Sequence, residues 1–407
     1  MSVGQTYGPE KCQFRDSETG AEITQYTTAG TVNRTLYFTN PSYVCDGERA
    51  IFLSDRTGRN EMFSLQFKSG QITQLTELPG QSNVSNCLHP SRPELYFHNG
   101  ELLCRVNLDT LKTEELLHTP EGFRLGLLNF AASPWLALQA TEQLPGITRR
   151  MPNTPRSGNF RAEWFFAKPR VLIYRLNVDT GELDCVWGDT KLLTHVQISP
   201  TNPDILIFSS FAGYGDDRCY YLDLSRRVKS VPQPIFPESL HARGSHECFT
   251  RRGNLYIQWM EGDLERFGDH LLYNGFRMLA GVPTKDIASA PFKKHLLPER
   301  QKDLMHHFTM SRDETWGVHD RWLTAPSYEE NLDWLTVFRH QDTDPQTVLV
   351  KLARHDTGTS DKSDLGPEVC LDAKDEHALY TSYVGGNAHV CEVRLTPFVE
   401  KLMKPPA

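Results

Sequence analysis

The chain has 407 residues, of which 39% are hydrophobic and 23% are charged, with 28 glycines and 25 prolines. This composition is typical of a globular protein and excludes a disordered chain, a collagen-like repeat and a small disulfide-rich scaffold. The 51 acidic residues outnumber the 43 basic ones, which gives a formal net charge of −8. We therefore expect no nucleic-acid partner, because domains that bind DNA or RNA carry basic patches.

The N-terminal segment and the cysteines predict a cytoplasmic protein. Residues 1–6 lack the basic stretch and following apolar segment that mark a secretion signal. No apolar run approaches the roughly 18 residues of a membrane helix, so we expect no membrane partner. The nine cysteines include no CxxC pair and are odd in number, a pattern that indicates reduced thiols rather than disulfides.

Short β-rich segments recur along the chain at intervals of roughly 40 to 70 residues, each after a polar turn. In chain order, the predicted strands are 50–53, 95–97, 135–138, 205–208, 255–257, 316–318 and 378–380. Two segments, around 141–165 and 261–305, look irregular, and we expect long loops or short helices there.

These repeats predict an all-β fold, a seven-bladed β-propeller in which residues 1–407 form a single domain. The intervals are close to the length of known propeller blades, and short strands between evenly spaced turns favour a closed array. A closed array of this kind explains why a chain of this length need not divide into two or three domains. The alternative is a protein of several β-sandwich domains. In a propeller, we expect the functional site at the mouth of the central channel.

Histidine is the most informative residue type, because several histidines precede the predicted strands. They are His89, His195, His241, His246, His306, His307, His340, His355 and His377. A lone histidine near a strand is usually structural, but repetition at one blade position favours a shared site. Arg218 and Arg354 are candidates to join them. Since arginine binds carboxylates through two hydrogen bonds, this set predicts an anionic ligand in a cationic channel.

Several segments of the chain resemble the oligogalacturonate lyase family. Residues 38–76, which include the run from Ser54 to Asn60, resemble the first blade of that family, and residues 99–108 resemble its second. Further similar segments are Thr194-His195-Val196-Gln197, Asp217-Arg218, Ser245-His246-Glu247, His307 and Arg354-His355-Asp356-Thr357. The resemblance extends over nearly the whole chain.

This resemblance implies an enzyme that cleaves acidic oligosaccharides by β-elimination. In such a reaction a base removes the C5 proton next to the uronate carboxylate, and the glycosidic bond at O4 then breaks. The resemblance assigns His246 as the base and Arg218 as its partner, which stabilises the carboxylate. We expect the other substrate-binding residues to be Arg59, His89, His195 and Arg354.

The metal site is where this sequence departs from the family, which holds manganese with three histidines and a glutamine. His307 matches one ligand, but Ser363, Gly366 and Glu368 stand at the other ligand positions. Glu368 offers at best one hard oxygen ligand. We therefore expect either no metal cofactor or a weakly bound divalent ion such as Mn²⁺, with His307 and Glu368 as its candidate ligands.

Three functions remain open at this point. The first is a uronate lyase, for instance for glucuronate-containing oligosaccharides, in which arginines replace the metal. The second is an oligogalacturonate lyase with a rearranged metal site. The third is a non-catalytic propeller that binds acidic sugars or a protein partner.

Overall fold

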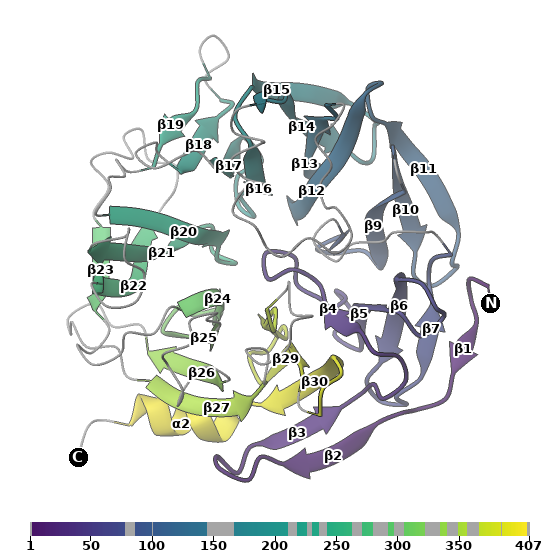
Figure 1. The fold of residues 1–407 in the computed structure, drawn as a ribbon, viewed down its shortest axis with the longest axis vertical. Helices are drawn as coiled ribbons and strands as arrows, with labels where there is room; N and C mark the ends of the chain where they lie inside the picture. The colour runs from purple at the N-terminus through teal and green to yellow at the C-terminus, as the bar shows by residue number, and fades with distance from the viewer. Residues whose placement is uncertain are drawn as a thin grey trace.

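Antiparallel sheets arranged in a ring make up the computed structural model of this chain (Figure 1). The structure describes residues 2–77, 86–99, 101–144, 167–210, 218–225, 230–235, 242–262, 271–279, 292–296, 305–321, 334–339, 349–355, 366–383 and 385–404. Within these ranges the strands pair into seven sheets, in which every strand pairing is antiparallel. The predicted all-β propeller is thereby confirmed as a fold class.

Each sheet runs outward from an inner strand near the ring centre to an outer strand. In ring order, the first comprises β4 (Asn33–Thr35), β5 (Arg49–Ser54), β6 (Glu61–Gln66), β7 (Ile72–Gln74) and β1 (Thr6–Tyr7). The second comprises β8 (Cys87–Leu88), β9 (Glu94–Asn99), β10 (Leu102–Asn107) and β11 (Thr113–His118). The third comprises β12 (Phe123–Ala132), β13 (Trp135–Glu142), β14 (Val171–Asn177) and β15 (Leu183–Asp189).

The remaining four sheets complete the ring. The fourth comprises β16 (Leu193–Ile198), β17 (Ile205–Ser210), β18 (Cys219–Asp223) and β19 (Gln233–Pro234). The fifth comprises β20 (Ala242–Phe249), β21 (Leu255–Gly262), β22 (Leu271–Leu279) and β23 (Phe292–Leu296), and the sixth β24 (Met305–Met310), β25 (Trp316–Arg321), β26 (Trp334–Arg339) and β27 (Leu349–Arg354). The seventh comprises β28 (Cys370–Leu371), β29 (His377–Ser382), β30 (His389–Arg394), β3 (Glu22–Gln25) and β2 (Cys12–Arg15).

The seven strands predicted from the repeats are all present, and each is the second strand of its sheet. They are apolar because they lie between the neighbouring strands of their own sheet and the two adjacent sheets. In β17, for example, all six residues are buried. Side chains of β14, β16 and β17, including Ile173, Ile198 and Phe208, form one apolar cluster between two sheets. Packing of this kind holds neighbouring sheets together.

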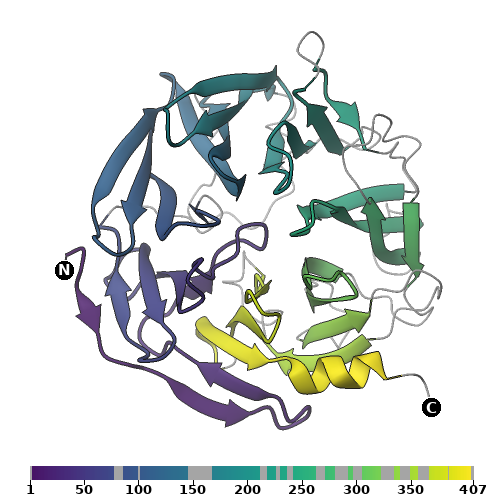
Figure 2. The same cartoon turned by 180° about the vertical axis from the view of Figure 1, so that it is seen from behind.

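Strands from near the two ends of the chain, β2 and β3 on one side and β28 to β30 on the other, form the seventh sheet together (Figure 2). Strand β3 pairs with β30, with Ile23 opposite Val393 and Gln25 opposite Cys391. The ring is therefore closed by backbone hydrogen bonds between the N-terminal and the C-terminal strands. Helix α2 (Thr396–Met403) follows β30 and packs against β26 and β27, with Phe398 and Leu402 buried.

Two expectations about irregular segments have different outcomes. The expectation of loops or short helices over 261–305 is wrong, since β22 and β23 lie there. Strand β22 pairs with β21 on one side and with β23 on the other. The apolar pattern does not predict these strands, because polar residues such as Asn274 and Lys294 interrupt their apolar runs. Most of the other segment, residues 145–166, lies outside the described residues.

The cysteines are unpaired in the folded chain. All nine are free, as the sequence predicts. Among the described residues, no helix has the length and apolar character needed to cross a membrane.

Candidate functional site

Three histidines lie in bulges of the inner strands of three consecutive sheets. The pairing of each inner strand with its neighbour shifts register within 194–197 of β16, 245–248 of β20 and 305–308 of β24. His195, His246 and His307 lie between the paired positions, inside these register shifts. Bulges redirect side chains and are common beside active sites. We call the side of the ring on which the inner strands begin the start face.

The backbone at this site is strained. His195 has φ +51°, His246 has φ +49° and Glu368, just before β28, has φ +53°. Residues with a Cβ rarely adopt these left-handed values, which cost about 1–3 kcal/mol each and are retained chiefly at functional sites. The three strained residues come from three different sheets.

The rings of the three histidines form one cluster with two aromatic residues that follow β4. The His246 ring centroid lies 5.0 Å from that of His307 and 6.2 Å from that of His195. Phe38 stacks on His307 with 4.5 Å between centroids, and Tyr37 lies 5.3 Å from His307. Side chains from the first, fourth, fifth and sixth sheets therefore converge at the centre of the ring.

His195 is held between a carboxylate and a phenol. Its Nδ1 lies 3.3 Å from Oε1 of Glu247, and its Nε2 lies 2.9 Å from the hydroxyl of Tyr37. Glu247 is fully buried and also accepts hydrogen bonds from the Ser209 hydroxyl and the Cys219 thiol. Burial alone would raise the pKa of Glu247, but His195, Arg218 and Ser209 outweigh it and lower the pKa to about 2. Glu247 is thus a carboxylate.

Arg218 lies beside this group, directly before β18. The side chain is buried, with only 9% of the residue exposed. Its positive charge acts to lower the pKa of both Glu247 and Tyr37, which places the guanidinium within electrostatic reach of both. The structure thus brings Arg218 to the same cluster as His246.

His307 lies between two buried carboxylates. Its Nδ1 is 3.3 Å from Oδ2 of Asp320 and 3.3 Å from Oε2 of Glu368. Burial acts to lower the pKa of His307, but the two carboxylates outweigh it and raise the pKa above the ordinary value. Burial also raises the pKa of Glu368, to about 7. The expected cationic channel therefore contains buried acidic groups as well.

These residues do not fit a tight manganese site. Gly366 has no donor atom, and a Cβ at that position would come within 3.0 Å of His307 Nδ1. Within the described part of the chain, the donor atoms of only one group of three lie within 4.8 Å of one another. That group is Asp372, Glu376 and His377, at a turn of the seventh sheet. Ser363 lies outside the described residues.

The two other predicted arginines lie further from the ring centre. Arg59 is in the connection from β5 to β6, 54% exposed at its side chain and 4.0 Å from Glu77. Arg354 is exposed at the end of the outer strand β27. Because β5 and β27 both end where inner strands begin, both arginines lie on the start face.

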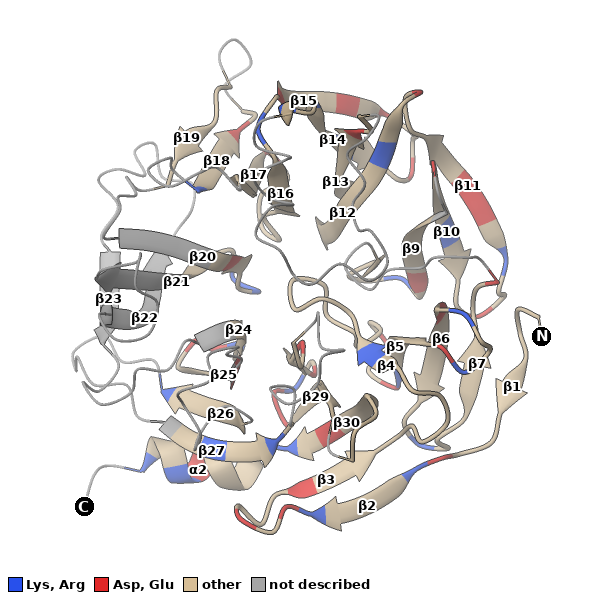
Figure 3. Cartoon of the chain, viewed as in Figure 1, with Lys and Arg blue, Asp and Glu red and all other residues tan. Residues whose placement is uncertain are grey.

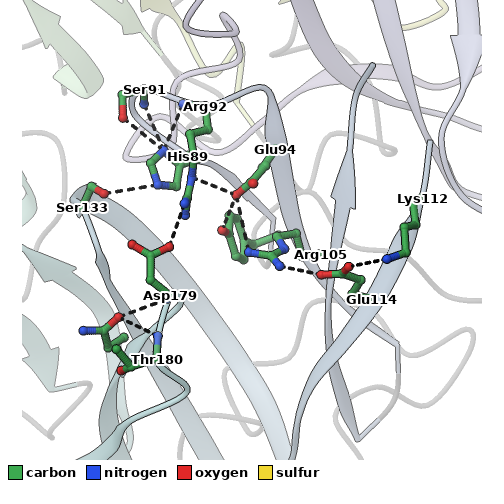
Figure 4. A network of polar contacts seen from close by, with 12 residues as sticks. His89, Ser91, Arg92, Glu94, Arg105, Lys112, Glu114, Ser133, Asp179 and Thr180 are labelled. Atoms are coloured by element: carbon green, nitrogen blue, oxygen red, sulfur yellow. Dashed lines mark hydrogen bonds and ion pairs between the residues drawn. The ribbon is translucent and has the colours of Figure 1, made fainter. Parts of the chain in front are cut away.

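His89 lies on the opposite face, in the connection that follows β8 (Figure 4). Its Nδ1 accepts hydrogen bonds from the backbone N–H groups of Ser91, at 3.1 Å, and Arg92, at 3.0 Å. Its Nε2 lies 3.3 Å from the Ser133 hydroxyl, and burial lowers its pKa to about 4. A neutral ring with both nitrogens engaged stabilises the turn. These contacts argue against the predicted role of His89 in substrate binding.

The network around His89 extends outward through ion pairs. Arg92 binds Asp179 of the third sheet at 2.7 Å and lies 3.3 Å from Glu94. Figure 4 shows the chain of contacts continuing to Arg105, Glu114 and Lys112 on the second sheet. This network joins two neighbouring sheets and contains no residue of the histidine cluster.

The sequence analysis missed four residues of the site. They are Arg34, Tyr37, Glu247 and Asp320. Arg34 lies in the inner strand β4, and its charge acts to lower the pKa of Glu368. Arg34 and Tyr37 lie in residues 33–37, directly before the first segment that resembles the family. This position is the one signal in the sequence for these two residues.

The comparison with known sequences decides the family. The family model described as oligogalacturonate lyase matches residues 1–397. The chain belongs to the oligogalacturonate lyase family. An oligogalacturonate lyase of Dickeya dadantii (strain 3937) is 24% identical over 268 residues, which cover 62% of this chain. An oligogalacturonide lyase of Pectobacterium atrosepticum is 22% identical over 268 residues. The matched region spans 65% of the length of each of these two relatives.

Solved structures of this family have the same fold. The crystal structure of an oligogalacturonate lyase from Vibrio parahaemolyticus superposes with a TM-score of 0.80 at 19% identity, covering 97% of this chain and 99% of that one. An oligogalacturonate lyase in complex with manganese superposes with a TM-score of 0.75 at 20% identity, covering 97% and 98%. At this level of identity, the likeness supports the propeller fold of this family member.

Proposed function

We propose that this protein is a carbon–oxygen lyase that cleaves uronic-acid-containing oligosaccharides by β-elimination. The observation that carries the proposal is the strained, half-buried His246 at the centre of the ring, next in the chain to Glu247, on which the charge of the buried Arg218 acts. Membership of the oligogalacturonate lyase family supports the same reaction. The substrate class is an acidic oligosaccharide built from galacturonate or glucuronate.

In this proposal His246 is the base that removes the proton from C5 of the sugar. That proton is weakly acidic because the neighbouring carboxylate can accept the charge of the resulting carbanion. A histidine has its ordinary pKa near neutrality, which suits a base that must both take and release a proton. Arg218 stabilises the developing negative charge on the carboxylate, and its guanidinium can hold both oxygens.

The proposed reaction needs no tightly bound metal. The family is represented by a structure in complex with manganese, but the donor set around His307 in this chain does not match a tight site. Arg218 and Arg34 supply fixed positive charge at the ring centre instead. A divalent ion such as Mn²⁺ at His307 and Glu368 would be weakly held.

We also propose that each of the seven sheets is one blade and that residues 1–407 form a single domain. The mixed seventh sheet supports this, since it joins both ends of the chain. The free cysteines support a reducing location such as the cytoplasm.

The test is an assay with purified protein and a panel of oligogalacturonates and glucuronate-containing oligosaccharides. The readout is the ultraviolet absorbance of the 4,5-unsaturated product. We expect product from at least one substrate, retained turnover in chelator, and loss of at least about 10²-fold in His246→Ala. The matched control is His118→Ala, because His118 is an exposed histidine on the outer strand β11.

Each arm of the assay has an outcome that contradicts the proposal. Absence of product with every substrate, with and without Mn²⁺, would refute the lyase. Binding of the acidic oligosaccharides without product would then favour the non-catalytic propeller. Turnover that chelator abolishes and Mn²⁺ restores would refute metal-independent catalysis.

A further inference from the structure

We propose that Tyr37 is the acid that protonates the leaving oxygen O4, and that His195 and Glu247 form the relay that supplies its proton. The inference rests on the proposed lyase function and adds a second reactive group to the base. It follows from three side chains that the fold brings together from three separate sheets.

The three groups form a continuous hydrogen-bonded chain. The Tyr37 hydroxyl lies 2.9 Å from Nε2 of His195, and Nδ1 of His195 lies 3.3 Å from Glu247. Tyr37 and His195 are each 8% exposed, and Glu247 is fully buried. Burial limits the access of water to this chain, and Tyr37 is the end that lies away from Glu247.

The polar surroundings hold Glu247 in place beside His195. The carboxylate of Glu247 is fixed by the Ser209 hydroxyl and the Cys219 thiol, while its backbone carbonyl accepts from the Gln197 amide at 2.7 Å. In the proposed relay His195 carries a proton on each ring nitrogen when the substrate binds, and the adjacent carboxylate of Glu247 balances that charge. With both nitrogens protonated, Nδ1–H donates to Glu247 and Nε2–H donates to the Tyr37 oxygen. The phenolic O–H of Tyr37 is then left to donate to a substrate.

Tyr37 has the properties of an acid rather than a base. A phenol carries its proton at neutral pH. The Tyr37 hydroxyl lies 2.9 Å from Nε2 of His195, which can replace a proton that the hydroxyl gives up. The hydroxyl can release its proton only to a strongly basic oxygen, such as the alkoxide that forms at O4.

Tyr37 also lies beside the proposed base. The ring of His195, which binds Tyr37, has its centroid 6.2 Å from that of His246. Phe38, the next residue along the chain, also lies 6.2 Å from His246. Acid and base are therefore neighbours, as removal of a proton from C5 and departure of the oxygen on adjacent C4 require.

The proton and electron transfers of the proposed step balance. His246 takes the C5 proton, the C5–H electron pair becomes the C4–C5 π bond, and the C4–O4 electron pair leaves with O4. O4 takes the proton of the Tyr37 hydroxyl, and Tyr37 takes the Nε2 proton of His195. His195 thereby changes from an imidazolium to a neutral imidazole and still donates from Nδ1 to Glu247. The proton gained by His246 then passes to solvent, and His195 recovers one from solvent.

The experiment compares Tyr37→Phe with the wild type on two substrates that differ in the leaving group. One is an oligogalacturonate, whose sugar oxygen needs a proton to leave. The other is a galacturonate with a nitrophenyl ether at O4, whose aryl oxygen leaves without one. We expect kcat to fall by about 10²-fold or more on the first substrate and by less than about threefold on the second.

A kinetic isotope effect separates catalysis from damage to the fold. Without the acid, cleavage of the C4–O4 bond becomes slower than proton removal. With deuterium at C5 of the substrate, the kinetic isotope effect on kcat of Tyr37→Phe should therefore be smaller than that of the wild type for the sugar leaving group. For the aryl leaving group it should be unchanged. The matched control is Tyr96→Phe, which removes a buried tyrosine hydroxyl that donates to Glu94 at 2.7 Å in the second sheet. This control should keep wild-type kcat on both substrates.

The outcomes are distinguishable from failure of the proposed function. Equal losses on both substrates, or an unchanged isotope effect with the sugar, would show that Tyr37 has a structural role only. Unchanged kcat of Tyr37→Phe on the oligogalacturonate would overturn the relay while leaving the lyase intact. A wild-type protein that forms no unsaturated product from either substrate would overturn both proposals.

Discussion

The conformation of single residues carries much of the functional argument. His195, His246 and Glu368 all adopt left-handed backbone angles that glycine would tolerate better. Each is retained at a free-energy cost, and each belongs to the central cluster rather than to an exposed turn. A protein selected for stability alone would place glycine at these positions.

The cost of this strain at His246 can be measured. We expect His246→Gly to be more stable than His246→Ala by about 1 kcal/mol, because glycine accepts φ +49° without a Cβ clash. The measurement is the free energy of unfolding in urea. At His118, an exposed strand residue without a left-handed angle, the order should reverse, with glycine less stable than alanine. Equal stabilities of the two His246 variants would show that the backbone there is unstrained.

At the scale of elements, the sequence predicts the second strand of every sheet but not the strands that close the ring. The second strands are apolar throughout and follow polar turns, so their pattern is local. Strands β8 and β28 have two residues each, too few for any periodicity. The pairing of β3 with β30 joins residues more than 360 positions apart and leaves no local signal in either segment.

For the site too, the sequence predicts only residues that belong to a local or periodic pattern. Repetition of histidine at one blade position pointed to His195 and His246, because that signal is periodic. The contacts of Glu247 with His195 and of Asp320 with His307 depend on bulges and on packing between sheets. A single sequence does not encode such contacts in any short pattern, so these residues became visible only in three dimensions.

The closing pair of strands predicts a strong effect of one substitution near the N-terminus. Ile23 of β3 is 4% exposed and packs with Val393 in an apolar cluster. We expect Ile23→Asp to lower the free energy of unfolding by at least about 3 kcal/mol, because it places an unpaired charge in the core at the ring closure. Thr24→Asn, on the more exposed side of the same strand, should change it by less than about 1 kcal/mol. Similar effects of both variants would mean that β3 does not close the ring.

At the scale of the whole molecule, acidic residues on the outer strands lie apart from the charged residues of the central site. Figure 3 shows acidic residues on outer elements such as β11 and β15, which together account for part of the net charge of −8. At the centre, Arg34 and Arg218 lie close to Glu247, Asp320 and Glu368. The net charge of the protein therefore does not indicate the sign of the ligand's charge, since the site contains both positive and negative groups.

A closed ring should unfold as one cooperative unit. Neighbouring sheets share apolar clusters, and the seventh sheet contains both ends of the chain, so loss of one sheet opens the ring. We expect a single transition in denaturant at which tryptophan fluorescence and far-ultraviolet circular dichroism coincide. Two separate transitions would instead favour several independent β-domains.

Closure of the ring by strands from both ends of the chain also determines when the central cluster can assemble. Tyr37 follows β4, which is among the first strands to leave the ribosome, whereas Glu368 precedes β28, which is among the last. The backbone N–H of Thr35 in β4 donates to the hydroxyl of Thr381 in β29, so the two ends are joined beside the cluster itself. A nascent chain that stops short of the last sheet therefore has its histidines but not the assembled centre. The central cluster therefore assembles only after the last sheet has been synthesised.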